Sequence, residues 1–358
     1  MLGFFHFVSA GCKAETFDRE SIEAYFQEIE DKDRYIEVYG AFQKFLGKRQ
    51  IENFTIYKTS YNSLVEPKGP KSQQEIDEKI KELDVIWKYL EKKGIPFLYV
   101  EPPLAIADES DLPSGVRDHS DENAAALHSK LSGISVIKIS ETDDPGKENM
   151  FYRTDHHWSG DACFRAYEMI ADRMIGENML KKRTPRDKYN RVSVGGFLGS
   201  YGIKAGKYYD GTDEYVYYQP DFDTTIEFNA YDPEGKLTDT RKGSWTDALM
   251  DTSVLKDPDY NNKYNAALWG NAAESRIIDH DADNDRKLLL ISHSYGRPLA
   301  TYFALDFQEV RMIDPQEGRF SGDYLRYIDE FEPDAVIFLC EIEGEIIGEY
   351  RTAEQGKQ

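Results

Sequence analysis

Apolar residues recur along the chain at two alternating spacings. Short continuous apolar runs, bounded by polar or turn-forming residues, are typical of buried β-strands. They occupy residues 95–100, 134–139, 287–292, 310–313 and 335–340. Other segments place apolar residues three and four positions apart, as amphipathic helices do. These are residues 72–94, 119–131, 159–174, 297–305 and 321–330. Strands that alternate with helices predict a central parallel sheet with helices on both faces.

Local signals support several of the expected helix ends. Ser72 begins a capping box, and Gly94 suits a helix C-terminus. Ser159 can cap the helix that follows it, and Pro298 is tolerated at the start of the helix near it. Residues 14–50 also carry a helical pattern. The fold class expected is therefore α/β.

The segment at about 190–270 departs from this alternation. It is rich in Gly, Tyr, Thr and Asp, and it carries β signals such as residues 215–218. We interpret it as a β-containing insertion with hairpins that forms part of the substrate surface. One α/β domain is therefore expected over residues 31–342, after an N-terminal segment 1–30 and before a C-terminal tail 343–358.

Composition and charge narrow the classes of function. The 358 residues, 40% hydrophobic and 13% aromatic, suffice for a large core, and the 24 Tyr suit sugar-contacting surfaces as well. A net charge of −22 argues against a nucleic-acid partner, because phosphates are neutralised by Lys and Arg. It also disfavours a strongly anionic substrate unless the site is locally basic; the plainest interpretation of the charge is solubility. Cys12, Cys163 and Cys340 have neither metal-binding nor disulfide spacing.

The start of the chain bears on localisation. No run approaches the roughly 18 consecutive apolar residues that span a membrane. Residues 1–8 are apolar but short for a signal peptide, and they lack a basic region. Residues 9–12, Ser-Ala-Gly-Cys, faintly resemble a lipoprotein cleavage site. We interpret the start as an export or anchor segment that is missing or truncated, with a lipoprotein signal and a cytoplasmic start as alternatives.

Asp155, His157 and Ser294 are the residue types of an acyl-transfer triad. In such a triad the serine attacks, the histidine moves the proton and the aspartate orients the histidine. Ser294 lies between an expected strand and an expected helix, at the carboxyl end of the sheet, where α/β sheets carry their sites. The amides of Tyr295 and Gly296 follow it and are candidate oxyanion donors. Function requires that the three side chains meet in space.

Each candidate also has a structural interpretation. Ser294 could only cap the helix, and Asp155 with His157 could belong to a solvated loop. Asn271 is a further candidate oxyanion donor, although a turn residue is the plainer interpretation. Arg319 could line the same rim or be a solvated surface arginine.

A metal site is the rival hypothesis for the same motif. Asp155, His156 and His157 could supply three ligands, but neither HExxH nor a second acidic motif accompanies them. We therefore expect no metal and no diffusible cofactor. His156 is interpreted as a supporting or surface residue, and His293 is given no role.

Several motifs together resemble the bacterial DHHW family, which is similar to the SGNH-hydrolase-like proteins that O-acetylate alginate. The resemblance covers most of residues 30–342. It rests on Asp155-His156-His157-Trp158, the strand and loop 289–295, Ile313-Asp314, residues 334–339, and the shorter stretches 33–36, 56–58 and 199–202.

The resemblance implies an SGNH-hydrolase-like fold in which Asp155, His157 and Ser294 form the triad. It implies an O-acetyltransferase that works through an acetyl-serine on hydroxyls of a cell-surface polysaccharide. Relatives of this kind act outside the membrane with a membrane-bound O-acyltransferase that delivers the acetyl group. Two positions depart from the family pattern: His293 replaces a frequent Asp, and the Asp-x-Arg motif is stretched to Asp314…Arg319.

Two alternatives stay open from the sequence. The same triad with water as the acceptor would make an acetylesterase. A non-catalytic polysaccharide-binding or assembly subunit would have a decayed site, and the two departures favour it.

Overall fold

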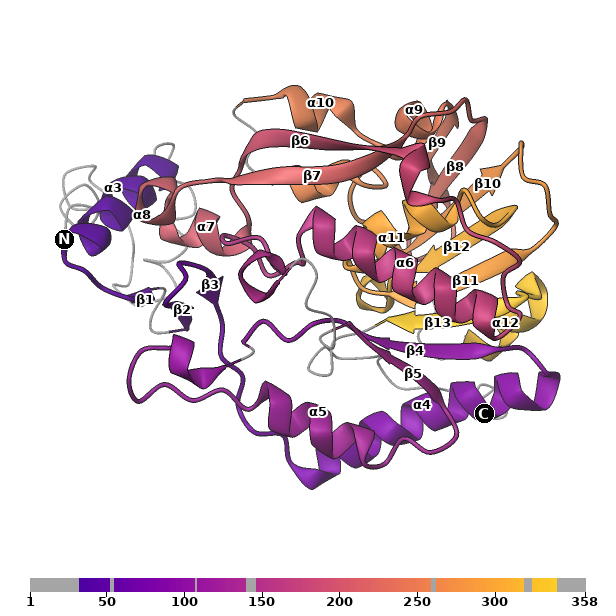
Figure 1. The fold of residues 1–358 in the computed structure, drawn as a ribbon, viewed down its shortest axis with the longest axis horizontal. Coiled ribbons are helices and arrows are strands. Elements are labelled where there is room, and N and C mark those ends of the chain that lie inside the picture. Colours follow the sequence, from indigo (N-terminus) through magenta and orange to yellow (C-terminus); the bar gives the residue numbers. More distant parts are fainter. Residues whose placement is uncertain are drawn as a thin grey trace, which may run out of the picture.

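The computed structural model describes most of the chain in detail. The described residues are 32–51, 55–106, 108–139, 146–258, 262–318 and 324–339. They form one eight-stranded sheet, a three-stranded sheet and a two-stranded ribbon (Figure 1). Cys12, Cys340 and Arg319 lie outside these ranges, as do residues 14–31 of the predicted helical segment 14–50.

The eight-stranded sheet has the order β5-β4-β13-β11-β12-β10-β8-β9. Its strands are β4 (Phe97–Glu101), β5 (Ser135–Lys138), β8 (Ile226–Tyr231), β9 (Leu237–Gly243), β10 (Glu274–Asp279), β11 (Lys287–Ser292), β12 (Glu309–Ile313) and β13 (Ala335–Leu339). The strands from β5 to β12 in that order run parallel, whereas β10, β8 and β9 are each antiparallel to their neighbours. The predicted central parallel sheet is confirmed, and an antiparallel side extends it.

Helices cover both faces of this sheet, as predicted. These helices are α4 (Gln73–Lys93), α5 (Ser120–His128), α6 (Gly160–Gly176), α11 (Gly296–Phe303) and α12 (Tyr324–Phe331), whereas α3 (Lys32–Phe45) lies apart from the sheet (Figure 1). Alternate residues of each strand face opposite sides. Phe97 and Tyr99 of β4 pack with α4, α5 and α12, whereas Leu98 and Val100 belong to the core that includes α6 and α11.

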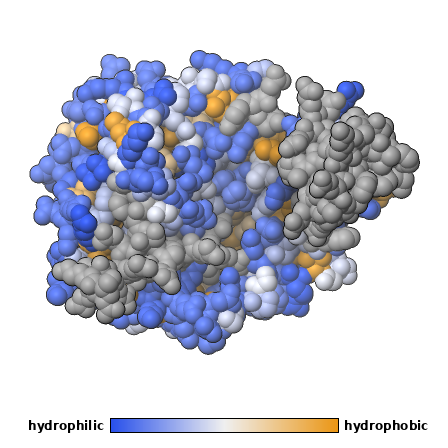
Figure 2. Space-filling view, turned by 180° about the vertical axis from the view of Figure 1, so that it is seen from behind, coloured by the Kyte–Doolittle hydropathy of each residue, from blue (hydrophilic) through white to orange (hydrophobic). Residues whose placement is uncertain are grey.

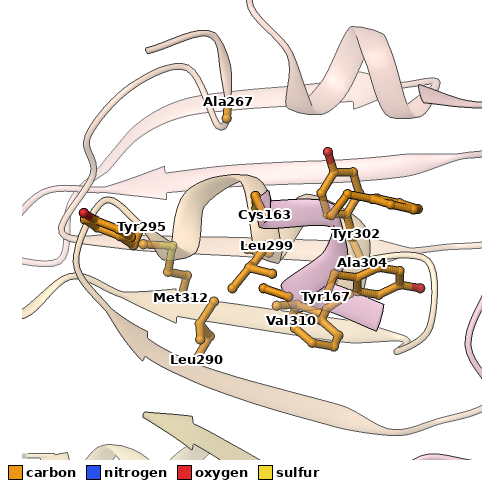
Figure 3. Close-up of a cluster of buried hydrophobic side chains, with 14 of the residues drawn as sticks. Cys163, Tyr167, Ala267, Leu290, Tyr295, Leu299, Tyr302, Ala304, Val310 and Met312 are labelled. Carbon is orange, nitrogen blue, oxygen red and sulfur yellow. The ribbon is translucent and has the colours of Figure 1, made fainter. Parts of the chain in front are cut away.

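Figure 3 shows part of the second core, where aromatic and aliphatic side chains of α6 and α11 meet strands β11 and β12. Tyr167 and Tyr302 lie on the helices, and Leu290 and Met312 lie on the strands. Cys163 is buried among them, so burial raises the pKa of its thiol well above the usual value. This thiol is a core residue.

The predicted helix ends are present. Ser72 and Glu75 form the capping box of α4, and Gly94 ends that helix with φ 70°. The Ser159 side chain accepts a hydrogen bond from the Ala162 amide at the start of α6. Among the described residues, no helix has both the length and the apolar character to cross a membrane.

Residues 190–270 hold two hairpins. The first pairs β6 (Tyr189–Phe197) with β7 (Asp213–Pro220), and the second pairs β8 with β9. Short helices connect these elements: α7 (Ser200–Ala205), α8 (Lys207–Asp210), α9 (Trp245–Leu249), α10 (Thr252–Lys256) and the 3₁₀ helix η6 (Lys263–Ala266). Because β8 joins β10, this segment completes the large sheet. The domain limits at 31 and 342 stay a prediction.

A small antiparallel sheet lies beside the large one. It consists of β1 (Gln50–Ile51), β2 (Ile56–Lys58) and β3 (Leu64–Val65). The Leu64 amide donates to the Arg153 carbonyl, which ties this sheet to the loop that precedes α6. The face in Figure 2 is largely hydrophilic with scattered apolar residues, as the net charge of −22 would suggest.

Candidate active site

A tight turn joins β11 to α11 and carries Ser294. The Gly296 amide donates to the His293 carbonyl at 2.9 Å, and the Arg297 amide donates to the Ser294 carbonyl at 3.2 Å. A Cβ on Gly296 would lie 2.6 Å from the Ser292 side chain, so only glycine lets the helix begin this close to the strand. The turn leaves Ser294 partly exposed at the carboxyl edge of the sheet.

The loop before α6 folds back on itself and gives Asp155 and His157 their geometry. Phe151 and Trp158 form an antiparallel bridge, and the Tyr152 amide donates to the His157 carbonyl at 3.2 Å. Within this turn, Oδ1 of Asp155 accepts the His157 amide at 2.9 Å and also the Nδ1–H of the same residue. The spacing of two residues is therefore sufficient because the backbone reverses between them.

The other ring nitrogen of His157 reaches across to the turn after β11. Its Nε2 lies 2.7 Å from Ser294 Oγ, a hydrogen bond between residues 137 positions apart. The structure thus brings Asp155, His157 and Ser294 into one hydrogen-bonded chain. This is the arrangement in which an imidazole can take a proton from a serine hydroxyl.

Further hydrogen bonds fix the carboxylate of Asp155 and the turn beside it. Oδ2 of Asp155 accepts the Ser200 amide at 2.7 Å. The Gly199 amide donates to Thr154 Oγ1 at 3.0 Å, and Thr154 Oγ1 donates to Asp213 at 2.6 Å. The Gly199-Ser200 turn therefore packs directly against the Asp155 side chain.

Burial and charge set the protonation of the pair. Burial favours a higher pKa for Asp155, but His157 and the hydrogen bonds outweigh it and hold that pKa well below its usual value. Burial lowers the pKa of His157 to about 4, although Asp155 opposes this. At neutral pH the pair is therefore a carboxylate and a neutral imidazole, the forms that a general base requires.

The other residues proposed from the sequence differ in their placement. The Tyr295 hydroxyl donates to the His156 carbonyl, and its ring centroid lies 5.1 Å from that of His157. The Gly296 amide is already engaged by His293, as described above. Asn271 is exposed and precedes β10. Arg319 lies outside the described residues.

Tyr264 and Arg297 belong to the site but were not predicted from the sequence. The Tyr264 ring stacks on the His157 ring, with centroids 3.7 Å apart and planes at 14°. The guanidinium of Arg297 lies 5.1 Å from the Tyr264 ring centroid. Arg297 follows Ser294 on the same helical turn, which was a usable signal, whereas Tyr264 stands in no motif.

The Asp155-His156-His157 cluster also fits part of the metal hypothesis. The possible ligand atoms of these residues lie within 4.8 Å of one another. However, both ring nitrogens of His157 are engaged by Asp155 and Ser294, and Nδ1 of His156 lies 2.8 Å from Ser200 Oγ. A metal ion would have to displace these hydrogen bonds.

Residues 61–196 match the family described as the SGNH hydrolase-like domain of the acetyltransferase AlgX. The chain is similar to that family. Among curated proteins no sequence match is found.

Two solved structures share the fold. Bacillus cereus PatB1 has a TM-score of 0.67 at 20% identity, covering 82% of this chain and 97% of that chain. A DHHW family protein from Eubacterium siraeum has a TM-score of 0.60 at 18% identity, covering 82% and 92%. PatB1 has also been solved with a sulfonyl adduct, at 19% identity and a TM-score of 0.67. The resemblance that the DHHW motif indicated, and the SGNH-like fold, are thus confirmed.

Proposed function

We propose that this protein is a serine-dependent O-acetyltransferase that acts on hydroxyl groups of a polysaccharide. The observation that carries the proposal is the hydrogen-bonded chain from Asp155 through His157 to Ser294 at the carboxyl edge of the sheet. The similarity to an SGNH-hydrolase-like acetyltransferase family supports the reaction class.

In the first half-reaction, Ser294 Oγ attacks the carbonyl carbon of an acetyl donor while Nε2 of His157 takes the hydroxyl proton. Asp155 holds Nδ1–H and stabilises the imidazolium that forms. The tetrahedral oxyanion develops beside the start of α11, where the Tyr295 amide is our candidate donor. Collapse breaks the bond to the leaving group, which receives the proton from His157, and acetyl-Ser294 remains.

In the second half-reaction, a sugar hydroxyl gives its proton to Nε2 of His157 and attacks the acetyl carbonyl carbon. The ester bond to Ser294 breaks, the serine oxygen regains the proton, and the acetylated sugar leaves. With water as the acceptor, the same steps would be those of an acetylesterase. Action outside the membrane, with a membrane-bound O-acyltransferase as the source of acetyl groups, is part of the same proposal.

The first test is a fluorogenic acetyl-ester assay on the wild type and on Ser294→Ala. Ser292→Ala is the matched control, because that serine is buried and donates to the His293 carbonyl. We expect turnover to be lost only in Ser294→Ala. Labelling with a sulfonyl fluoride and peptide mapping should place the adduct on Ser294.

A second measurement separates transfer from hydrolysis. Candidate polysaccharides are supplied with the ester donor, and acetyl gain is followed by NMR. Acetylated glycan supports the transferase, and acetate release that no glycan affects indicates an esterase. Equal turnover in Ser294→Ala and wild type, or no turnover in either, would favour a non-catalytic binding subunit.

A further inference from the structure

Tyr264 contacts both the candidate base, His157, and the candidate nucleophile, Ser294. Its ring covers the His157 imidazole in a near-parallel stack at 3.7 Å, and its hydroxyl donates to the Ser294 carbonyl at 3.3 Å. The residue is only 2% exposed. One rigid side chain therefore touches the base and the backbone of the nucleophile, which come from distant parts of the sequence.

Arg297 is buried next to this tyrosine. It is 4% exposed, and its Nη1 donates to Asn265 Oδ1 at 3.2 Å. Within the described ranges its Nε has no hydrogen-bond partner, and no carboxylate forms an ion pair with it. A buried guanidinium without an ion pair is costly, so its position beside the Tyr264 ring calls for an explanation.

The charge of Arg297 acts on the same imidazole. A positive charge near a histidine disfavours its protonation, and Arg297 contributes in this direction to the lowered pKa of His157. The cation also lies over the face of the Tyr264 ring, 5.1 Å from its centroid, where the interaction is favourable. Arg297 can therefore hold the Tyr264 ring in place and bias the charge state of His157 together.

We propose that Tyr264 and Arg297 are positioning residues: Tyr264 holds the His157 ring in line with Ser294, and Arg297 fixes Tyr264 and brings a positive charge close to the imidazole. The proposal rests on the function proposed above. The ring of His157 can then accept the serine proton, and the imidazolium that forms returns it readily to the leaving group.

Other charged and titratable groups also lie near His157 or Arg297. Asp155 and His156 lie on its own loop, and Tyr295 faces it from the start of α11. Asp314, at the end of β12, lies within electrostatic range of Arg297. Asp155 favours the protonated ring, whereas His156 and Arg297 disfavour it. Removal of Arg297 should therefore make His157 easier to protonate.

The first test separates the stack from the hydroxyl of Tyr264. Tyr264→Phe keeps the ring, so kcat/KM for the acetyl ester should stay within about threefold of wild type. Tyr264→Leu loses the flat face, and kcat should fall about 30-fold or more with KM nearly unchanged, because a misplaced base weakens only the chemical step. Tyr189 is a buried tyrosine at the start of β6, and Tyr189→Leu is the control whose kinetic constants should not change in the folded protein.

The second test concerns the charge. In Arg297→Met the acid limb of the kcat/KM profile should move to higher pH, and Arg297→Lys, which keeps the positive charge, should reverse most of that shift. NMR titration of the His157 ring in ¹⁵N-histidine-labelled Ser294→Ala, with and without Arg297→Met, reports the same shift without turnover. The result of this titration does not depend on whether the protein is an acetyltransferase.

The outcomes are distinct. A ring titration that moves in Arg297→Met and returns in Arg297→Lys supports the positioning role, even if no acceptor is ever acetylated. An unchanged ring titration in Arg297→Met, or a folded Tyr264→Leu with wild-type kcat, overturns it. If Tyr264→Leu does not fold, Tyr264→Phe and the two Arg297 variants still decide the question.

Discussion

Substitution of Gly199 tests how large a displacement of the Asp155 side chain the candidate site tolerates. Its backbone has φ −76° and ψ −177°, which any residue can adopt, so Gly199→Ala adds no backbone strain. The new Cβ would lie 2.2 Å from the Asp155 Cβ and 2.4 Å from its Oδ2. The substitution therefore acts by steric conflict with one side chain of the candidate triad.

The size of the effect follows from these distances. Ordinary contact begins at 3.4 Å, so the closest pair must separate by 3.4 − 2.2 = 1.2 Å. A displacement of about 1 Å in a catalytic group can cost about 10²-fold in rate, or about 2.7 kcal/mol. The conflict should also lower the free energy of unfolding by about 1–3 kcal/mol, as overpacking typically does.

The assay is kcat/KM on a fluorogenic acetyl ester, with urea unfolding of the same preparations. Gly195→Ala is the matched control, since no atom lies within 4 Å of its Cβ and it stands on the neighbouring strand β6. We expect about a 10²-fold loss in Gly199→Ala and little change in Gly195→Ala. A folded Gly199→Ala protein with kcat/KM within threefold of wild type would refute the reasoning.

Asp155→Asn removes the charge that holds His157, so kcat should fall by about 10⁴-fold in steady-state assays, and a loss under tenfold would contradict the role. Because the folded pKa of His157 is about 4, turnover should persist at pH 5.5, and the stability due to the neutral ring, complete above about pH 6.5, should be lost towards pH 4 in urea titrations. A wild-type stability profile that is flat over this window, or no steeper than that of His157→Gln, would count against it. Lys263→Met leaves three carbonyl groups near the end of α10 without the Nζ donor and should lower the unfolding free energy by about 2–3 kcal/mol; the exposed Lys204→Met is the control, and equal values would argue against it.

Much of the parallel half of the fold could be predicted, because its strands are continuous apolar runs buried on both faces. In the antiparallel half, hairpins were expected over residues 190–270, but strand β10 could not be predicted. Strand β10 begins with Glu274, Ser275 and Arg276, which do not form an apolar run. It is stable as a central strand because β12 and β8 pair on either side and Arg276 forms an ion pair with Glu274. Such partners come from distant sequence and leave no local pattern.

The candidate site, too, could be predicted only in part. The residues of the candidate triad could be picked out by chemical type and by motif, since acyl transfer needs a hydroxyl, an imidazole and a carboxylate. Tyr264 could not, because its importance lies in the face that it presents to His157 once η6 has folded against the turn after β11. The hydrogen bond that engages the Gly296 amide is likewise a property of the turn, which the order of residues alone does not reveal.

The antiparallel side of the large sheet ends in β9, which is therefore an edge strand. An edge strand has unpaired N–H and C=O groups and can pair with other polypeptides unless charged residues oppose it. The segment Thr238-Asp239-Thr240-Arg241-Lys242 is polar throughout, and a register shift opposite Ala230 and Tyr231 bends its pairing with β8. The protein can therefore lengthen its sheet on this side without creating a template for fibrous aggregation.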